Sequence, residues 1–350
     1  MTLVESAAAP TIALIGNPNT GKSTLFSALA GVRQRVGNYP GVTVEKKLGR
    51  MTHDGRTYTL IDLPGTYSLA PRSPDEMVAV DLLLGRLDEG APDAVLAIID
   101  ASNLERNLYL VSQVLELGLP TVVALNMTDV AEARGVTIDV AELSKRIGAP
   151  VVAIQAHHSV GLEALRGALG TACAASVVST PVDVFPPQFD AEVAGLAATY
   201  SQLTSTEAPP RYLLRRLLLD TSGYLESRLF PSGEKSGDGS TEVNGPLAEA
   251  VRQSRERLKA AGLPVPAVEA MSRYAWVGRI VDGTVRRSET RPDTVTDRID
   301  RIVTHRWWGS LIFTAMMVVV FQAVFQWAAP VMSLIDAGVG YVGEWTASIV

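Results

Sequence analysis

The sequence predicts a mixed, mostly parallel six-stranded α/β sheet, followed by a small all-α domain and a transmembrane helix. Three observations predict this fold class. Short apolar runs alternate with helical stretches from residue 11 to about residue 170, and the chain then keeps helical spacing without convincing strands. Finally, no charged residue occurs between Arg306 and Asp336.

Six strands are expected in the first domain. Four near-continuous apolar runs are typical of strands buried on both faces of a parallel sheet. The other two are joined by a short polar turn containing Asp54 and Gly55, which indicates a hairpin and one antiparallel edge. The six runs cover residues 11–15, 42–49, 57–62, 94–100, 121–126 and 151–154.

The chain is expected to divide into five segments. A Gly/Ser-rich stretch at 231–240 is predicted to be a loop inside the helical part. In order, the segments are an α/β domain (1–170), a helical spacer (171–290), an amphipathic juxtamembrane segment (291–308), a transmembrane helix (309–330) and the start of a membrane domain (331–350).

The uncharged run is long enough to span a bilayer. Its core, residues 311–329, suits a hydrocarbon layer roughly 30 Å thick. Tryptophans at positions 307, 308 and 327 would form aromatic belts, and a buried core helix is the alternative. Gln322 and Gln326 could face a partner helix or a polar path, although most such glutamines only hydrogen-bond between helices. The positive-inside rule places the preceding chain in the cytoplasm, because four basic residues come just before the run: Arg298, Arg301, His305 and Arg306.

Composition excludes several classes of protein. A net charge of −6 over 350 residues argues against a nucleic-acid binder. The single cysteine, Cys173, excludes an intramolecular disulfide and any multi-cysteine metal site. Residues 1–10 lack the basic and apolar regions of a secretory signal.

A phosphate-binding loop follows the first strand. The pattern G-x-x-x-x-G-K-S lies between a predicted strand and a predicted helix, which is the context it requires. Backbone N–H groups at the helix N-terminus would wrap the phosphates. Lys22 would reach the β- and γ-phosphates, and the Ser23 hydroxyl would bind Mg²⁺. The candidate residues are Gly16, Asn17, Pro18, Asn19, Thr20, Gly21, Lys22, Ser23 and Thr24.

Two further segments are expected to sense the γ-phosphate. Asp62 ends the third strand, where it would hold Mg²⁺ through water, and Gly65 would offer its N–H to the γ-phosphate. Between this motif and the phosphate loop, the segment containing Gly41, Val42 and Thr43 resembles a first switch. Thr43 is the candidate for the hydroxyl that joins the Mg²⁺ shell only with the γ-phosphate present.

The base is predicted to be guanine. Asp129 follows the fifth strand and can accept two N–H bonds from guanine, which adenine cannot offer. Asn126 is expected to tie the loops together, and Met127 to keep the apolar stem of the lysine usual at its position. These residues favour GTP and GDP over ATP.

Two positions depart from the usual GTPase pattern. The last base-contacting loop reads Gln155-Ala-His-His, in which the Ala156 N–H could meet guanine O6. His157 and His158 are interpreted as polar surface rather than as metal ligands. Thr66 stands where many GTPases have a water-orienting glutamine, so hydrolysis should be slow or rely on another device.

Taken together, these motifs resemble the bacterial ferrous iron transport protein B family. The resemblance extends over essentially the whole chain. It rests on the phosphate loop, Asn38-Tyr-Pro-Gly-Val-Thr-Val-Glu, Asp62-Leu-Pro-Gly-Thr-Tyr-Ser-Leu, Asn126-Met-Thr-Asp and the run from Thr296 to Gly309 before the apolar helix.

The resemblance implies a GTPase that controls Fe²⁺ import across the bacterial cytoplasmic membrane. It implies that Asn17 helps to coordinate K⁺, whose charge would act as an arginine finger does. It also implies self-association, small accessory iron-transport proteins and further membrane helices beyond Val350. Two alternatives remain at this stage: a membrane-anchored regulatory switch, and an assembly GTPase acting on ribosome or tRNA, against which the charge and the apolar run weigh.

Overall fold

The computed structural model describes residues 9–31, 34–38, 45–70, 74–86, 90–174, 183–221, 225, 244–288, 295–327, 332–333 and 335–341. By internal contacts the chain divides into two compact units, Met1–Glu289 and Thr290–Val350. The first unit holds the α/β sheet together with the helical region that follows it. The five-segment division expected from the sequence therefore stays a prediction at its finer boundaries.

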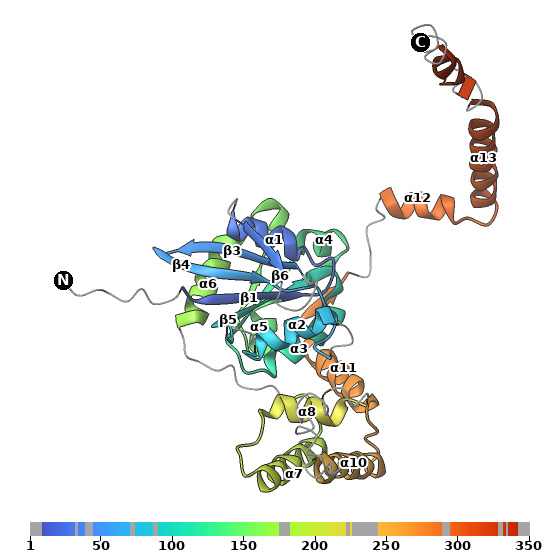
Figure 1. Ribbon diagram of the computed structural model, residues 1–350. Helices are drawn as coiled ribbons and strands as arrows, with labels where there is room; N and C mark the ends of the chain where they lie inside the picture. The colour runs from blue at the N-terminus through green and yellow to red at the C-terminus, as the bar shows by residue number, and fades with distance from the viewer. Residues whose placement is uncertain are drawn as a thin grey trace, which may run out of the picture. The chain divides into compact units, whose positions relative to one another are not determined.

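A seven-stranded sheet forms the centre of the first unit, in the order β2-β3-β4-β1-β5-β6-β8 (Figure 1). The pairs from β4 to β8 are parallel, whereas β2–β3 and β3–β4 are antiparallel. The mixed, mostly parallel sheet is thus confirmed. Its strands are β1 (Thr11–Gly16), β2 (Gln34–Asn38), β3 (Glu45–His53), β4 (Arg56–Asp62), β5 (Ala94–Asp100), β6 (Thr121–Asn126) and β8 (Val151–Ala153).

The expected count of six strands was wrong by one. The additional strand, β2, lies at the sheet edge and pairs only with β3. Its sequence, Gln-Arg-Val-Gly-Asn, carries no apolar run, and its one large apolar side chain, Val36, is 64% exposed. An edge strand with no buried face gives no hydrophobic periodicity. Residues 42–44 of an expected strand lie outside the described residues.

Helices cover both faces of the sheet. Alternate residues of β1 point to opposite faces, so Ile12 and Leu14 join one apolar cluster and Ala13 and Ile15 the other. The first cluster is completed by α1 (Lys22–Ala30) and α6 (Leu162–Ala174). The second is completed by α2 (Pro74–Leu83), α3 (Leu104–Leu115) and α5 (Val140–Ile147).

The helical region shares the second cluster, so its core is continuous with one face of the sheet. Phe189, Leu217, Val251 and Trp276, one from each helix, are all buried in it. The helices are α7 (Pro187–Thr204), α8 (Arg211–Leu219), α10 (Asn244–Ala260) and α11 (Ala267–Val281). The predicted loop at 231–240 lies outside the described residues.

The spacer is not purely helical as expected. Its final strand, β9 (Val285–Arg287), pairs antiparallel with β7 (Val136–Ile138), which follows the short helix α4 (Thr128–Ala133). Three residues per strand are too few to show a period in the sequence. The pairing returns the chain to the α/β domain before it leaves the first unit.

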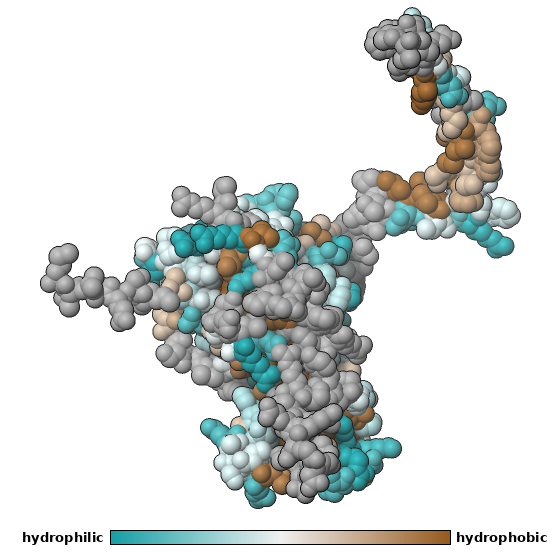
Figure 2. Space-filling model, in the orientation of Figure 1, coloured by the Kyte–Doolittle hydropathy of each residue, from teal (hydrophilic) through white to brown (hydrophobic). Residues whose placement is uncertain are grey.

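The second unit holds an amphipathic helix and a long apolar one. They are α12 (Val295–Val303) and α13 (Trp308–Gln322), the latter continued by a π-helical turn over Ala323–Trp327. Residues Trp308–Gln326 are long and apolar enough to cross a membrane, with a mean hydropathy of 1.9. None of these residues is buried, which does not fit a core helix. Figure 2 shows the hydrophobic surface of this segment.

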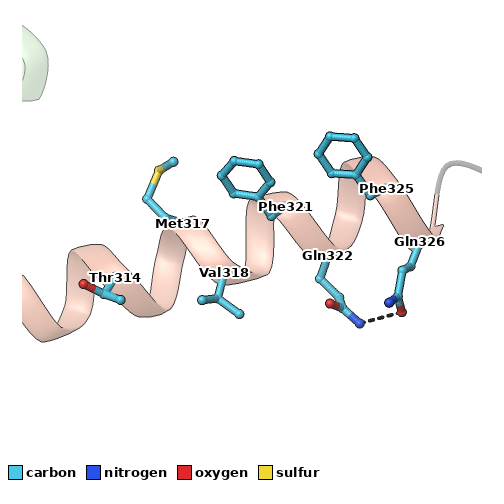
Figure 3. A pocket seen from close by; sticks show the side chains of 7 residues that line it. All are labelled: Thr314, Met317, Val318, Phe321, Gln322, Phe325 and Gln326. Carbon is cyan, nitrogen blue, oxygen red and sulfur yellow. Dashed lines mark hydrogen bonds between the residues drawn. The ribbon is translucent and has the colours of Figure 1, made fainter.

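One face of α13 and of the π-helical turn that continues it carries two amide side chains. Gln322 donates a hydrogen bond from Nε2 to Oε1 of Gln326 at 2.6 Å (Figure 3). They line a shallow depression together with Thr314, Met317, Val318, Phe321 and Phe325. The pair satisfies one donor and one acceptor within the helix, which lowers the cost of placing amides in an apolar surrounding.

Candidate nucleotide-binding site

The predicted site residues converge at the carboxyl end of the parallel strands. Gly16 ends β1 beside Ile98 of β5, and Asp100 at the end of β5 pairs with Asn126 at the end of β6. Asp62 ends β4, next to β1 on its other side. Ligands of open α/β sheets bind at this edge. The sheet order therefore brings together loops that lie far apart in the sequence.

The phosphate loop connects β1 to α1 in a tight turn. Gly21 has φ +83°, and a Cβ built there would clash with the Asn126 amide nitrogen. Only glycine suits this position. The Thr20 hydroxyl closes the turn by donating to the Asn17 carbonyl at 2.9 Å. Because α1 begins at Lys22, the first N–H groups of the helix are at the loop, where an anion would bind.

Lys22 and Asp62 form an ion pair. The two side chains are only 12% and 6% exposed, so both charges are largely removed from water. Ser23 lies in the first turn of α1 and is exposed. A hydroxyl and a carboxylate are oxygen ligands of the kind that Mg²⁺ prefers, so Ser23 and Asp62 fit the ion. Thr43, Gly41 and Val42 lie outside the described residues.

Asn17 is buried without a hydrogen-bond partner. Its residue is 3% exposed, and neither Oδ1 nor Nδ2 has a partner within the described part of the chain. A buried amide left in this state costs about 1–3 kcal/mol for each group. A ligand that binds at this amide would explain why it has no partner within the protein.

Asn126 joins two loops, as expected from the sequence. Its Nδ2 donates to the Thr20 carbonyl at 2.9 Å, and its Oδ1 accepts from the Ala156 N–H at 3.0 Å. In the structure the Ala156 N–H therefore donates to Asn126, and its predicted contact with guanine O6 stays a prediction. The sequence showed the loop but could not show which of its N–H groups Asn126 takes.

The base loop turns sharply at Met127. This residue has φ +61° and precedes α4, and Asp129 lies in the first turn of that helix. The Met127 methyl carbon lies 3.7 Å from the Cβ position built on Gly21, so its side chain reaches over the phosphate loop. This placement suits the apolar role expected for Met127. Asp129 is half-buried.

The loop after β4 runs along the phosphate loop. Thr66 donates its N–H to the Gly16 carbonyl at 3.2 Å, and Gly65 lies beside Pro18. The Thr66 hydroxyl donates to the Ser68 carbonyl at 2.7 Å and accepts from the Ser68 N–H at 3.2 Å. It is 2% exposed and engaged within its own turn. Thr66 therefore does not replace a water-orienting glutamine.

Known proteins resemble this chain in fold and in sequence. The family model described as "Ferrous iron transport protein B" matches residues 10–169. A crystal structure of a mutant S. thermophilus NFeoB bound to GDP is 32% identical, with a TM-score of 0.65, and the match covers 79% of this chain and 100% of that one. The chain belongs to the FeoB family. It therefore carries the GTP-binding domain of that family.

Full-length relatives are much longer. The Fe(2+) transporter FeoB of Salmonella typhimurium is 38% identical over 94% of this chain and 40% of its own length. An Fe(2+) transport protein A/Fe(2+) transporter FeoB fusion protein of Porphyromonas gingivalis is 36% identical over 95% of this chain and 39% of its own length. The chain thus spans about two-fifths of these relatives.

A polar contact that sequence reasoning missed joins the nucleotide loops of this FeoB-family chain to its helical region. Gln113 of α3, which is fully buried, accepts at Oε1 from the Leu69 N–H at 2.6 Å. Its Nε2 donates to Ser68 Oγ and to Glu269 Oε1 of α11, each at 3.0 Å. The Tyr212 hydroxyl of α8 adds a bond to the Leu69 carbonyl at 3.1 Å. Of the spacer helices, α8 therefore contacts the segment after Gly65 directly, and α11 contacts it through Gln113.

Buried charges surround this contact. Glu116 accepts from Arg215 at 2.7 Å and from Arg273 at 2.6 Å, and Glu269 accepts from Arg273 at 2.9 Å and also pairs with Arg216. Burial favours the neutral acid, but the two guanidinium groups outweigh it and hold the pKa of Glu269 at about 2. Glu269 is therefore charged at neutral pH. No local sequence signal marks this network, because its members come from three helices.

Proposed function

We propose that the nucleotide state of this domain gates or drives the import of Fe²⁺ across the bacterial cytoplasmic membrane. GTP would be bound and hydrolysed on the cytoplasmic side, with α13 in the bilayer. The relatives' names supply the iron, and the fused relative suggests a small accessory partner of the transport protein A type. The observation that supports the gating is a pair of hydrogen bonds at the Gln113 side chain. It accepts one from the Leu69 N–H and donates the other to Glu269.

The gating follows from where those bonds lie. Gly65 would sense the γ-phosphate, and Ser68 and Leu69 come three and four residues after it. When the loop moves on hydrolysis, the buried donors and acceptors of Gln113 must find new partners or lose them at about 1–3 kcal/mol each. The helices α8 and α11 would then adjust to the nucleotide, and the chain leaves the unit after β9, the strand that follows α11.

Removing the Gln113 amide should uncouple the two regions. In the wild type, hydrogen exchange of α11 should differ between GDP and a non-hydrolysable GTP analogue. In Gln113→Leu this difference should disappear, since leucine cannot bridge Leu69 and Glu269. Gln253→Leu is the matched control, because Gln253 is exposed on α10 and its side chain donates to Glu249 of the same helix. An unchanged difference in Gln113→Leu would contradict this gating.

Ser23 and Asp62, with Thr43, are proposed to hold Mg²⁺. When bound, the ion neutralises charge on the β- and γ-phosphates. The Lys22–Asp62 ion pair keeps the carboxylate at this place, and Lys22 can turn to the phosphates once they are bound. The N–H of His157, next along from Ala156, is our proposal for the guanine O6 donor.

Hydrolysis is proposed to be slow and to be stimulated by K⁺ at Asn17. GTP turnover should be faster in KCl than in NaCl for the wild type, and equal in both for Asn17→Ala. The Asn17 amide has no partner among the described residues, so the replacement removes no described side-chain hydrogen bond and should not lower the unfolding free energy. Potassium stimulation that persists in Asn17→Ala would refute the role of this residue.

A further inference from the structure

The short helix α12 has an exposed apolar face. Ile299, Ile302 and Val303 are 54%, 54% and 49% exposed. Their spacing of three and four residues places them on one side of the helix, while Asp300 and Arg301 lie on another. A helix with such a face is stable only where something apolar covers it.

A tight corner separates α12 from α13. The Gly309 N–H donates to the His305 carbonyl at 2.7 Å, and a Cβ at Gly309 would clash with the Val303 carbonyl oxygen. Only glycine allows this approach. His305 Nδ1 accepts from the N–H groups of Trp307 and Trp308 at 3.3 and 3.4 Å, at the start of α13. The corner is therefore built by specific contacts, and α12 and α13 do not form one continuous helix.

The corner sets the direction of the apolar face. Figure 1 shows α12 lying across the lower end of α13. In Figure 2 the hydrophobic surface of α12 is on the side toward which α13 extends, and its hydrophilic surface is on the opposite side. If α13 crosses a bilayer, the apolar face of α12 is turned toward that bilayer and its charges toward water.

We propose that α12 is a membrane-surface helix whose apolar face is covered by lipid of the cytoplasmic leaflet. This inference rests on the proposed membrane crossing of α13. Amphipathic helices bury such faces at the boundary between headgroups and acyl chains. Trp307 and Trp308, at the corner, are 74% and 59% exposed and suit the interfacial layer. Arg306 lies 5.8 Å from the Trp307 ring, where its charge is close to lipid headgroups.

Lipid fits this face better than a protein partner would. Three apolar residues form too small a patch for a stable protein–protein interface, which buries roughly 800 Å² on each side. A membrane helix attached to α12 holds it at the bilayer, so even weak lipid binding is intramolecular and sufficient. The membrane would then fix the direction in which the chain enters the cytoplasm.

Spin labels on the full chain in phosphatidylcholine–phosphatidylglycerol vesicles test the proposal. In a Cys173→Ser background, single labels are placed through Ile302→Cys, Asp300→Cys and, as a reference inside α13, Val319→Cys. The ratio of accessibility to oxygen over that to a nickel chelate rises with depth in lipid. It should be several-fold higher at position 302 than at 300, and highest at 319.

The outcomes separate this proposal from the membrane crossing. Equal ratios at 302 and 300, with a lipid signal at 319, would overturn the surface helix and leave the crossing intact. A label at 302 shielded from both oxygen and nickel would mean a protein partner and would also overturn it. A water-exposed label at 319 would refute the crossing itself. Adding Gly309→Val should bring the 302 label into water while the 319 label stays in lipid.

Discussion

Asp129→Asn is expected to lower the affinity for GTP by roughly 10²-fold or more, because a site built to accept two guanine N–H bonds keeps only one acceptor and gains an opposed donor. An asparagine amide presents one acceptor and one donor group, so the donor meets the guanine amine. Xanthine carries a carbonyl in place of that amine and should bind the variant instead. Asp129 is held in position by the first turn of α4, whose loop Asn126 fastens to the phosphate loop.

Titration with fluorescent GTP and xanthosine triphosphate measures this exchange of specificity. Glu132→Gln is the matched control, since Glu132 lies on α4 and is exposed. The control should bind GTP as the wild type does. If Asp129→Asn bound GTP equally well and gained no affinity for xanthosine triphosphate, the assignment of the base to Asp129 would be wrong.

Arg273→Met is expected to destabilise the first unit by about 3–5 kcal/mol, the cost of leaving buried charges without their partner. Arg273 is fully buried and donates to Glu116, Glu269 and Ser112 Oγ, the last at 2.8 Å. Methionine fills much of the volume but offers no donor. Each carboxylate would keep one arginine, Arg215 or Arg216, with fewer bonds to satisfy it.

Urea unfolding followed by circular dichroism measures the decrease in unfolding free energy. Arg252→Met is the control, since Arg252 is 64% exposed and pairs with Glu249 in the same helix. Exposed ion pairs contribute little to stability because water screens them, so the control should be close to the wild type. Equal unfolding free energies for the two variants would show that the buried network does not stabilise the unit.

The sequence predicted those parts of the protein whose chemistry requires a local pattern. The phosphate loop needs Gly21 because a positive φ and the close Asn126 exclude a side chain, so the motif is visible in the letters alone. The buried parallel strands are visible for a similar reason, since burial on both faces requires an apolar run.

The missed features depend on tertiary contacts. Strand β2 is polar and is held in the sheet by its pairing with β3. Strand β9 is likewise held by its pairing with β7. Gln113 and Glu269 are 156 residues apart and give no local signal. The hydrogen bond from the Ala156 N–H to Asn126 also gives no local signal, because Asn126 belongs to another loop.

Uptake of radioactive Fe²⁺ tests the proposed function most directly. Cells without their own ferrous iron importer would express the full locus that encodes this chain, as wild type, as Asp129→Asn or as Glu132→Gln, at equal membrane levels. We expect uptake with the wild type and the Glu132→Gln control, and background uptake with Asp129→Asn. Uptake by Asp129→Asn at the wild-type rate, although the purified variant no longer binds GTP, would contradict nucleotide control of iron import.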